Sequence, residues 1–246
     1  MELPDSLTTR RALLGSVGAT LAGTGVVYGA SRLDPSGPSS MTPAPMHSSS
    51  ETTGLGVALQ GHPVMGSMDA PLDIYYWSDY QCPFCQRFER DTLPSLVDDY
   101  VRPGDVRLVF IEYPYLGQRS WTAAVMDRCV WRQVREDDAR AYWRWHSAVF
   151  AEQDSGTSEW ASKANLLEVT RGVEGVDAAA VEDCLATHRS DVEAAIEDDV
   201  AQARRFGIRG TPAFVVYNRD ADAAGKLVGA QPYERFEEAI RRVQNA

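Results

Sequence analysis

Two cysteines separated by two residues stand where a strand pattern changes into a helix pattern. The β-branched and aromatic run Leu72–Trp77 predicts a strand, and Ser78–Gln81 predicts a turn after it. Cys82 then opens a helix, where Pro83 is tolerated because its missing N–H would have no partner in a first helical turn. A chain of this kind needs a strand, a tight turn and a helix around Cys82 and Cys85.

This placement favours redox chemistry by the two thiols. The first thiol of such a pair faces unpaired backbone N–H groups and the positive end of the helix dipole, which favour the thiolate. We therefore expect Cys82 to be the nucleophile and Cys85, one turn further on, to be the resolving thiol. A zinc site would need two more ligands, and Cys129 and Cys184 lack the CxxC spacing. An inert structural disulfide rarely lies on a strand-to-helix turn.

The remaining pattern predicts an α/β fold with a central mixed sheet flanked by helices. A strand, a helix and a second strand in succession imply a parallel pair with a right-handed crossover. About 100 residues of helical pattern follow, and then a strand hairpin and a last amphipathic helix. The further strands are expected at Val106–Ile111, Ala213–Tyr217 and Lys226–Val228, with Asn218–Gly225 as the hairpin loop.

Length and charge narrow the class of protein. The 246 residues suit one domain that carries a large insertion. The net charge of −11 disfavours nucleic acid, which needs a basic surface. Lys163 and Lys226 are the only lysines, while arginine and aspartate are abundant. This bias fits either a protein that works in high salt or the codon usage of a GC-rich genome.

The amino terminus has the pattern of an export signal. Arg10 and Arg11 directly precede the uncharged and weakly hydrophobic stretch Ala12–Ala30, as in twin-arginine signals. Residues 1–30 are therefore expected to be a signal or, if uncleaved, a membrane anchor. Residues 31–56 are rich in Ser, Thr, Pro and Gly, so we expect a flexible linker before a domain at 57–246. The protein would lie outside the cytoplasm, anchored or released.

Over residues 62–243 the sequence resembles the DsbA-like branch of the thioredoxin superfamily. Five motifs in the same order carry the resemblance: Met68-Asp69-Ala70-Pro71, Ser78 to Cys85, Tyr142-Trp143 with His146 and Phe150, Gly210-Thr211-Pro212-Ala213-Phe214, and Gly229-Ala230-Gln231-Pro232-Tyr233.

The resemblance implies a thioredoxin-like fold with a large helical insertion at about 115–205. Pro212 would be cis and would face the cysteine pair, and the backbone at Thr211 and Arg209 would align a substrate polypeptide. Substrates would be cysteine-containing exported polypeptides, with no bound cofactor and with a separate redox partner for regeneration. Phe84 departs from the best-known oxidases, which have His beside the second cysteine, so a strongly oxidising potential does not follow.

Four other residues are candidates for roles around the dithiol. Cys129 and Cys184 lie in the helical block, where they either form a structural disulfide or remain free and buried. Glu89 and Asp79 flank the cysteine pair, and either carboxylate could accept the proton that Cys85 loses, unless both are solvated surface charges.

Two further side-chain groups are expected to be structural. His146 is expected to be packed and hydrogen-bonded, and Asp198-Asp199 to be a solvated helix end.

The sequence thus predicts an exported thiol–disulfide oxidoreductase that forms or exchanges disulfides in secreted or cell-surface proteins. The same residues could run the reaction in reverse, as a reductase or isomerase, because the direction depends on reduction potential. The CxxC pair would also suit a Cu(I) carrier, and the same fold could serve as a binding module without redox activity.

Overall fold

The computed structural model describes residues 41–155 and 160–246. The predicted signal at residues 1–30 and the first part of the predicted linker lie outside the described residues. None of the helices in the described ranges combines the length and the apolar character needed to cross a bilayer.

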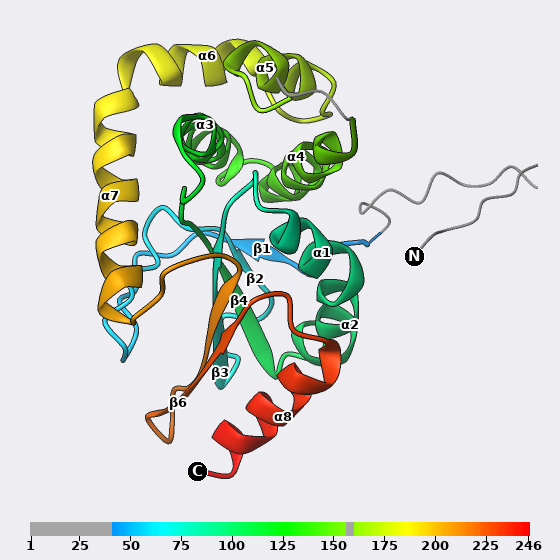
Figure 1. The fold of residues 1–246 in the computed structure, drawn as a ribbon, viewed down its shortest axis with the longest axis vertical. Helices are drawn as coiled ribbons and strands as arrows, with labels where there is room; N and C mark the ends of the chain where they lie inside the picture. Colours follow the sequence, from blue (N-terminus) through cyan, green and yellow to red (C-terminus); the bar gives the residue numbers. More distant parts are fainter. Residues whose placement is uncertain (1–40, 156–159) are drawn as a thin grey trace, which may run out of the picture. The chain divides into compact units, whose positions relative to one another are not determined.

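A six-stranded mixed sheet forms the centre of the fold (Figure 1). Its two central strands, β3 and β4, are parallel, as the strand–helix–strand pattern predicts. β5 pairs with β3 antiparallel, and β6 pairs with β5. The strand order β1-β2-β4-β3-β5-β6 comprises Met46–His47, Val64–Met65, Val106–Glu112, Leu72–Ser78, Ala213–Asn218 and Ala223–Val228.

Both faces of the central strands are buried because their side chains alternate between two apolar layers. On one face, Tyr76 stacks on Phe214 and packs against Phe88 from the first helix. On the other face, Tyr75 and Trp77 belong to a second apolar cluster. A strand that is apolar on both sides must be covered twice, which explains why helices lie on both sides of the sheet.

The first face is covered by the helices between β3 and β4 and by the helix that follows β6. These are α1 (Pro83–Asp91), α2 (Leu93–Leu96), a π-helical turn at Val97–Val101 and the last helix α8 (Tyr233–Gln244). The helix α1 ends at Asp91, and α2, which contains Pro94, continues its path. The carboxyl end of α7 covers the second face through Ala203, together with Val57 and Leu59.

A helical insertion lies between β4 and β5 (Figure 1, green to orange). It contains α3 (Gln118–Val134), α4 (Ala139–Ala151), a 3-10 turn (Glu152–Ser155), α5 (Lys163–Arg171), α6 (Ala178–Thr187) and α7 (Arg189–Arg205). The large helical insertion predicted as part of the fold is present, and its helices run from Gln118 to Arg205. A disulfide between Cys129 and Cys184 joins α3 to α6.

The prediction of a flexible linker at residues 31–56 is wrong for residues 41–56. Met46 belongs to β1 and is buried in the main apolar cluster, with Ala44 beside it. The Trp143 indole donates a hydrogen bond of 3.3 Å to the carbonyl of Met41. The segment is folded because it pairs with β2, an interaction that its local composition does not reveal.

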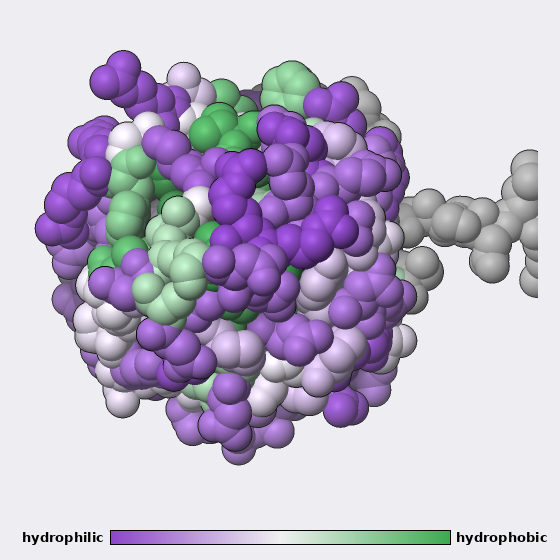
Figure 2. Space-filling model, turned by 90° about the horizontal axis from the view of Figure 1, so that it is seen from below, coloured by the Kyte–Doolittle hydropathy of each residue, from purple (hydrophilic) through white to green (hydrophobic). Residues whose placement is uncertain are grey.

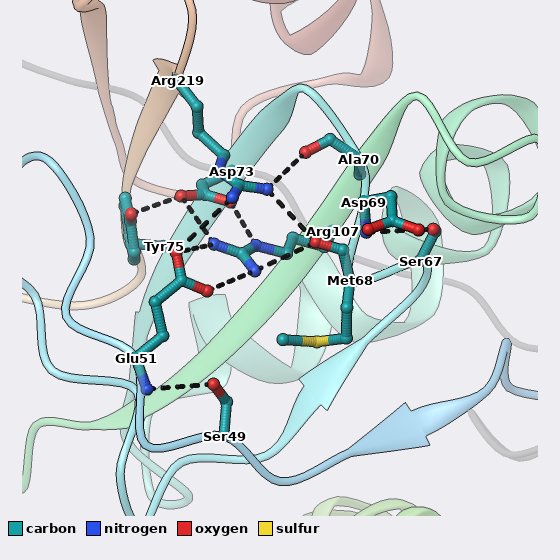
Figure 3. A network of polar contacts seen from close by, with 10 residues as sticks. All are labelled: Ser49, Glu51, Ser67, Met68, Asp69, Ala70, Asp73, Tyr75, Arg107 and Arg219. Carbon is teal, nitrogen blue, oxygen red and sulfur yellow. Dashed lines mark hydrogen bonds and ion pairs between the residues drawn. The ribbon is translucent and has the colours of Figure 1, made fainter.

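A buried ion network fastens this amino-terminal segment to the sheet (Figure 3). Arg107, fully buried on β4, pairs with Asp73 on β3 at 2.5 Å and with Glu51 at 3.0 Å. Arg219 approaches Glu51 at 3.5 Å and donates to the carbonyl of Ala70. The Arg107 hydrogen bond holds the pKa of Glu51 below its ordinary value against the opposing effect of burial.

The second strand of the hairpin begins earlier than predicted. β6 begins at Ala223, within the expected loop Asn218–Gly225, and pairs residue for residue with β5. The true turn is shorter, with Asp222 in the left-handed region at φ 52°. Ala223, Ala224 and Gly225 have weak strand preference, so pairing with β5 sets their conformation. The molecular face seen in Figure 2 is mostly hydrophilic, with hydrophobic residues gathered on one part of it.

Candidate active site

The turn between β3 and α1 holds both cysteines of the pair. Cys82 is the N-cap of α1, with extended backbone angles, and Pro83 occupies the first turn. The N–H of Cys82 donates to the carbonyl of Asp79 at 2.9 Å, and the Cys82 carbonyl accepts from the N–H of Cys85 at 3.0 Å. The strand-to-helix arrangement predicted from the sequence is therefore present, with Cys82 at the positive end of the helix.

The surroundings of Cys82 favour its thiolate. They lower its pKa to about 6, chiefly through the hydrogen bond from the Cys85 thiol, with further contributions from Thr211 and from the amides of Phe84 and Cys85. Burial opposes this effect but does not overcome it. At neutral pH the reduced dithiol thus carries its negative charge on Cys82.

Cys85 has the opposite character. It is fully buried, whereas Cys82 reaches the surface with 5% of its area. Burial, and then the adjacent Cys82, raise the pKa of the Cys85 thiol well above its ordinary value. The pair consists of a thiolate that keeps a small exposed area and a fully enclosed thiol, which is the division of roles that nucleophile and resolving cysteine require.

The loop before β5 lies against Cys82. The Thr211–Pro212 peptide bond is cis, and the Cys82 thiol donates to the Thr211 carbonyl at 3.3 Å. The Pro212 carbonyl accepts from the N–H of Gly229 at 2.8 Å, which fastens the loop to the end of β6. Arg209 is exposed on the same loop. The structure therefore brings Thr211 and Pro212 to the dithiol and leaves Arg209 at the rim.

Asp79 shapes the turn from inside. Its buried carboxylate accepts from the backbone N–H of Gln81 at 2.8 Å, of Tyr115 at 2.8 Å and of Leu116 at 3.0 Å. Burial raises the pKa of Asp79, although these hydrogen bonds act in the opposite direction. The carboxylate thus ties the loop after β4 to the cysteine turn.

Glu89 is buried in a chain of hydrogen bonds and is not a solvated surface charge. Its Oε1 lies 3.1 Å from Nε2 of His146, and Nδ1 of His146 lies 2.8 Å from the hydroxyl of Tyr80. Tyr80 in turn donates to Asp127 at 2.6 Å. The expectation of a packed, hydrogen-bonded His146 is confirmed. The chain links α1 to the insertion helices α3 and α4 beneath the cysteine turn.

Glu112 is a residue that the sequence analysis missed. It ends β4 opposite Ser78, is 3% exposed, and both of its carboxyl oxygens lack a hydrogen-bond partner among the described residues. Burial raises its pKa well above the ordinary value, and the nearby Asp127 and Asp79 add to this effect. The sequence does contain a signal for this residue. Glu112 is a charged residue at the carboxyl end of a predicted strand that runs parallel to the strand before the cysteines.

Exposed apolar side chains surround Cys82. The large hydrophobic residues that remain exposed in the described chain are Phe84, Tyr115, Leu116 and Val228. Phe84 lies between the two cysteines in the sequence. The backbone N–H groups of Tyr115 and Leu116 donate to the Asp79 carboxylate, and Val228 pairs with Ala213, which follows Pro212. Together they form an apolar rim around the reactive sulfur.

The insertion also braces the turn. Gln153 donates to the carbonyl of Tyr80, and Gln86 on α1 donates to the carbonyl of Phe150 at 3.0 Å. The Cys129–Cys184 disulfide holds the insertion together and has no part in the dithiol site.

Comparisons with known proteins give a consistent family. A sequence profile described as Thioredoxin matches residues 59–242. Disulfide bond formation protein D of Bacillus subtilis (strain 168) is 25% identical over 162 residues, which cover 66% of this chain and 70% of that protein.

Two solved structures resemble the fold. Oxidised BdbD from Bacillus subtilis superposes with a TM-score of 0.63 at 24% identity, covering 81% of this chain and 100% of that one. Alpha-DsbA1 from Wolbachia pipientis gives a TM-score of 0.66 at 22% identity, covering 79% and 96%. The predicted fold class, a thioredoxin-like sheet with a helical insertion, is confirmed by these likenesses and by the sheet described above.

Proposed function

Because this chain belongs to the thioredoxin family and is a protein thiol:disulfide oxidoreductase, we propose that it forms disulfides in exported proteins through Cys82 and Cys85. The observation that carries the proposal is the contrast between the two thiols. Cys82 keeps 5% of its area exposed and has a pKa of about 6, whereas Cys85 is fully buried with a raised pKa. Export rests on the twin-arginine pattern before Ala12–Ala30, and places the protein outside the cytoplasm, anchored or released.

The reaction is a two-step exchange. A substrate thiolate attacks Cys82 of the oxidised enzyme, the Cys82–Cys85 bond breaks, and Cys85 leaves with the bonding electron pair. A second substrate thiolate then attacks the substrate sulfur of the mixed disulfide, and Cys82 leaves as a thiolate. The substrate loses two electrons and the dithiol gains them, so a separate redox partner must reoxidise the enzyme.

The low pKa of Cys82 favours the oxidising direction. A leaving thiol with a low pKa departs more readily, and a stabilised thiolate makes the reduced enzyme the preferred product. Its value of about 6 is above that of DsbA, about 3.5. The side chain of Phe84 cannot donate a hydrogen bond to Cys82, which fits a pKa above that of DsbA.

The buried acids supply a place for the proton that Cys85 exchanges. We assign this role to Glu89, whose carboxylate is connected through His146 and Tyr80 to Asp127. Glu112 at the same end of the sheet is a second buried carboxyl group. Asp79, the other acceptor that the sequence suggests, has its oxygens directed to backbone N–H groups, so we assign it to holding the turn.

Substrate recognition uses the loop of Thr211 and the apolar rim. The backbone at Thr211 and Arg209 precedes β5 and offers strand-like hydrogen bonds to an extended polypeptide. The exposed Phe84, Tyr115 and Leu116 suit an unfolded chain with apolar side chains beside its cysteine.

The reduction potential of the dithiol tests the proposal. We would equilibrate the protein in glutathione buffers at low and high salt, with Cys82→Ser as control. A potential clearly above that of thioredoxin, about −270 mV, supports the oxidase, and one near or below it indicates a reductase. If no glutathione-linked couple exists, the redox proposal is wrong and the Cu(I) carrier or binding module replaces it.

Alkylation kinetics test the roles of the two thiols. In the reduced protein, iodoacetamide should modify Cys82 at a rate that rises with a midpoint near pH 6, its pKa. Cys85 should remain unmodified over that range because it is buried and its pKa is raised. Equal reactivity of the two thiols at pH 7 in mass spectrometry would contradict the assignment.

A further inference from the structure

A cavity of about 360 Å³ lies between the insertion helices α3 and α7, separate from the dithiol. One wall comes from α3 and the residue after it: Arg128, Trp131 and Arg132 lie on the helix, and Arg135 is its C-cap. The opposite wall comes from α7 and includes Asp191 and Asp198. Residues three and four apart share a helix face, so each wall follows from the sequence spacing of its helix.

The floor of the cavity is a buried ion cluster of Arg128, Asp199 and His62. Arg128 donates to Asp199, and Nε2 of His62 lies 3.0 Å from the same carboxylate. Burial acts to raise the pKa of Asp199, but His62 and Arg128 outweigh it and hold that pKa below its ordinary value. The predicted solvated helix end at Asp198-Asp199 is therefore wrong for Asp199, which is buried.

Four buried nitrogens of the residues that line this cavity have no hydrogen-bond partner within the described residues. They are Nδ1 of His62, Nε of Arg128, Nε1 of Trp131 and Nε of Arg135. The side chains of His62, Arg128 and Trp131 are more than nine-tenths buried. A buried N–H without an acceptor is costly, so a ligand that presents acceptor oxygens to α3 would relieve it.

The two walls carry opposite charges. Beyond the ion cluster of the floor, the α3 wall contributes Arg132 and Arg135, and α7 contributes Asp191 and Asp198. Arg135 also pairs with Glu136 at 3.2 Å, whereas Arg132 makes no ion pair among the described residues. The lining is therefore close to neutral overall but polarised, and neither a simple anion nor a simple cation matches it.

We propose that the cavity binds a small zwitterion of the α-amino acid type, with its carboxylate toward α3 and its ammonium toward α7. The volume suits a molecule of that size, and Val192, Ala195 and the Trp131 ring offer an apolar surface to a side chain.

This site is distinct from the dithiol site. Ser120 on α3 contacts Gln81 beside the cysteine turn. Arg128 lies eight residues further along the same helix, a rise of about 12 Å.

A titration with matched ligands tests the proposal. The probes are leucine, 4-methylpentanoate, which lacks the amino group, and 3-methylbutylamine, which lacks the carboxylate. We would follow the indole N–H signal of Trp131 in ¹H–¹⁵N spectra of the full chain, assigned with Trp131→Phe. Leucine should shift this signal and bind about tenfold more tightly than either analogue, because each analogue loses one charged hydrogen bond.

Substitutions at the cavity rim provide the second test. Arg132→Gln combined with Arg135→Gln should weaken leucine binding about tenfold, and Asp198→Asn should weaken it by several-fold. All three positions lie at the rim, so folding is preserved. Arg140→Gln, an exposed change on α4 outside the cavity, is the matched control and should leave the affinity unchanged. Equal binding of leucine and 4-methylpentanoate, an unmoved Trp131 signal, or unaltered affinity in the rim variants would each overturn the proposal.

Discussion

The two ends of the central strands β3 and β4 differ in whether their buried charged groups have partners. At their amino ends, Asp73 of β3 pairs in register with Arg107 of β4, and Glu51 completes the neutralisation (Figure 3). At their carboxyl ends, Ser78 lies opposite Glu112, whose oxygens have no partner among the described residues. The same pair of strands thus carries a compensated charge cluster and an uncompensated one.

The pKa directions follow this difference. Arg107 lowers the pKa of Glu51 at the compensated end. Burial raises the pKa of Glu112, and also that of Asp127, at the end that holds the dithiol. A paired buried ion holds structure in place, while a buried carboxyl group with a raised pKa can exchange a proton near neutral pH. The comparison assigns stability to one end and proton chemistry to the other.

Removing the cation at the compensated end should have the largest effect on stability. Arg107→Met leaves the fully buried Asp73 carboxylate without its cationic partner, and breaking a buried pair in this way costs about 3–5 kcal/mol. Urea unfolding at pH 7 measures the loss. Arg171→Met is the matched control, because Arg171 pairs with Glu168 on the surface, where an ion pair contributes about 0.5 kcal/mol. If both variants lose a similarly small free energy of unfolding, the buried ion pair of Arg107 contributes no more to stability than a surface pair.

Glu112→Gln should act in the opposite direction. A carboxyl group with a raised pKa holds its proton in the folded state and releases it in the unfolded state, so folding stability falls as pH rises above the unfolded pKa of about 4.3. The glutamine has the same shape and no proton to lose. At pH 8 the variant should therefore be more stable than the parent by roughly 1–3 kcal/mol.

The pH dependence of that difference is the decisive feature. Unfolding curves from pH 4 to pH 8 should show the gain from Glu112→Gln shrinking towards zero at pH 4, where the parent carboxyl is protonated in both states. A gain that stays constant with pH would mean that Glu112 does not titrate on unfolding. A loss of stability at pH 8 would mean that the carboxylate is ionised and paired in solution.

The sequence predicted the elements with strong local patterns. The run Leu72–Trp77 and the helix opening at Cys82 are set by side chains within a few residues, so strand, turn and N-cap were found from spacing alone. The segment at 41–56 was misread because its order depends on Arg107 and on β2, which lie far along the chain. The composition of a segment indicates how much apolar surface it can bury by itself, but it does not indicate which distant residues the segment will contact.

The site was predictable to the extent that motifs encode it. Cys82, Cys85, Thr211 and Pro212 stand together as their motifs imply. Glu112 was missed because a lone glutamate at the end of a strand looks solvated until the insertion covers it. Glu89 is likewise buried only because His146 of the insertion packs on it. Burial of charge in this protein is a tertiary property of the insertion.

Glu51→Gln gives the smallest effect and tests how much of the compensated end depends on its outermost carboxylate. The Glu51 pKa is lowered in the fold, so it stabilises the protein above its unfolded pKa and ceases to do so as pH falls through the folded pKa. Because its side chain is about one-third exposed, solvent screening limits the contribution to about 0.5 kcal/mol at pH 7.

The Glu51→Gln deficit should therefore disappear as pH falls below the lowered pKa of Glu51, in contrast to the gain from Glu112→Gln, which grows with rising pH. Glu182→Gln, an exposed change on α6, is the control and should show neither trend. A deficit of several kcal/mol at pH 7 would instead mean that Glu51 holds residues 41–56 on the sheet as a unit. In that case the neutralisation of Arg107 would depend on Glu51 as much as on Asp73, and the amino-terminal segment would be an integral part of the compensated end.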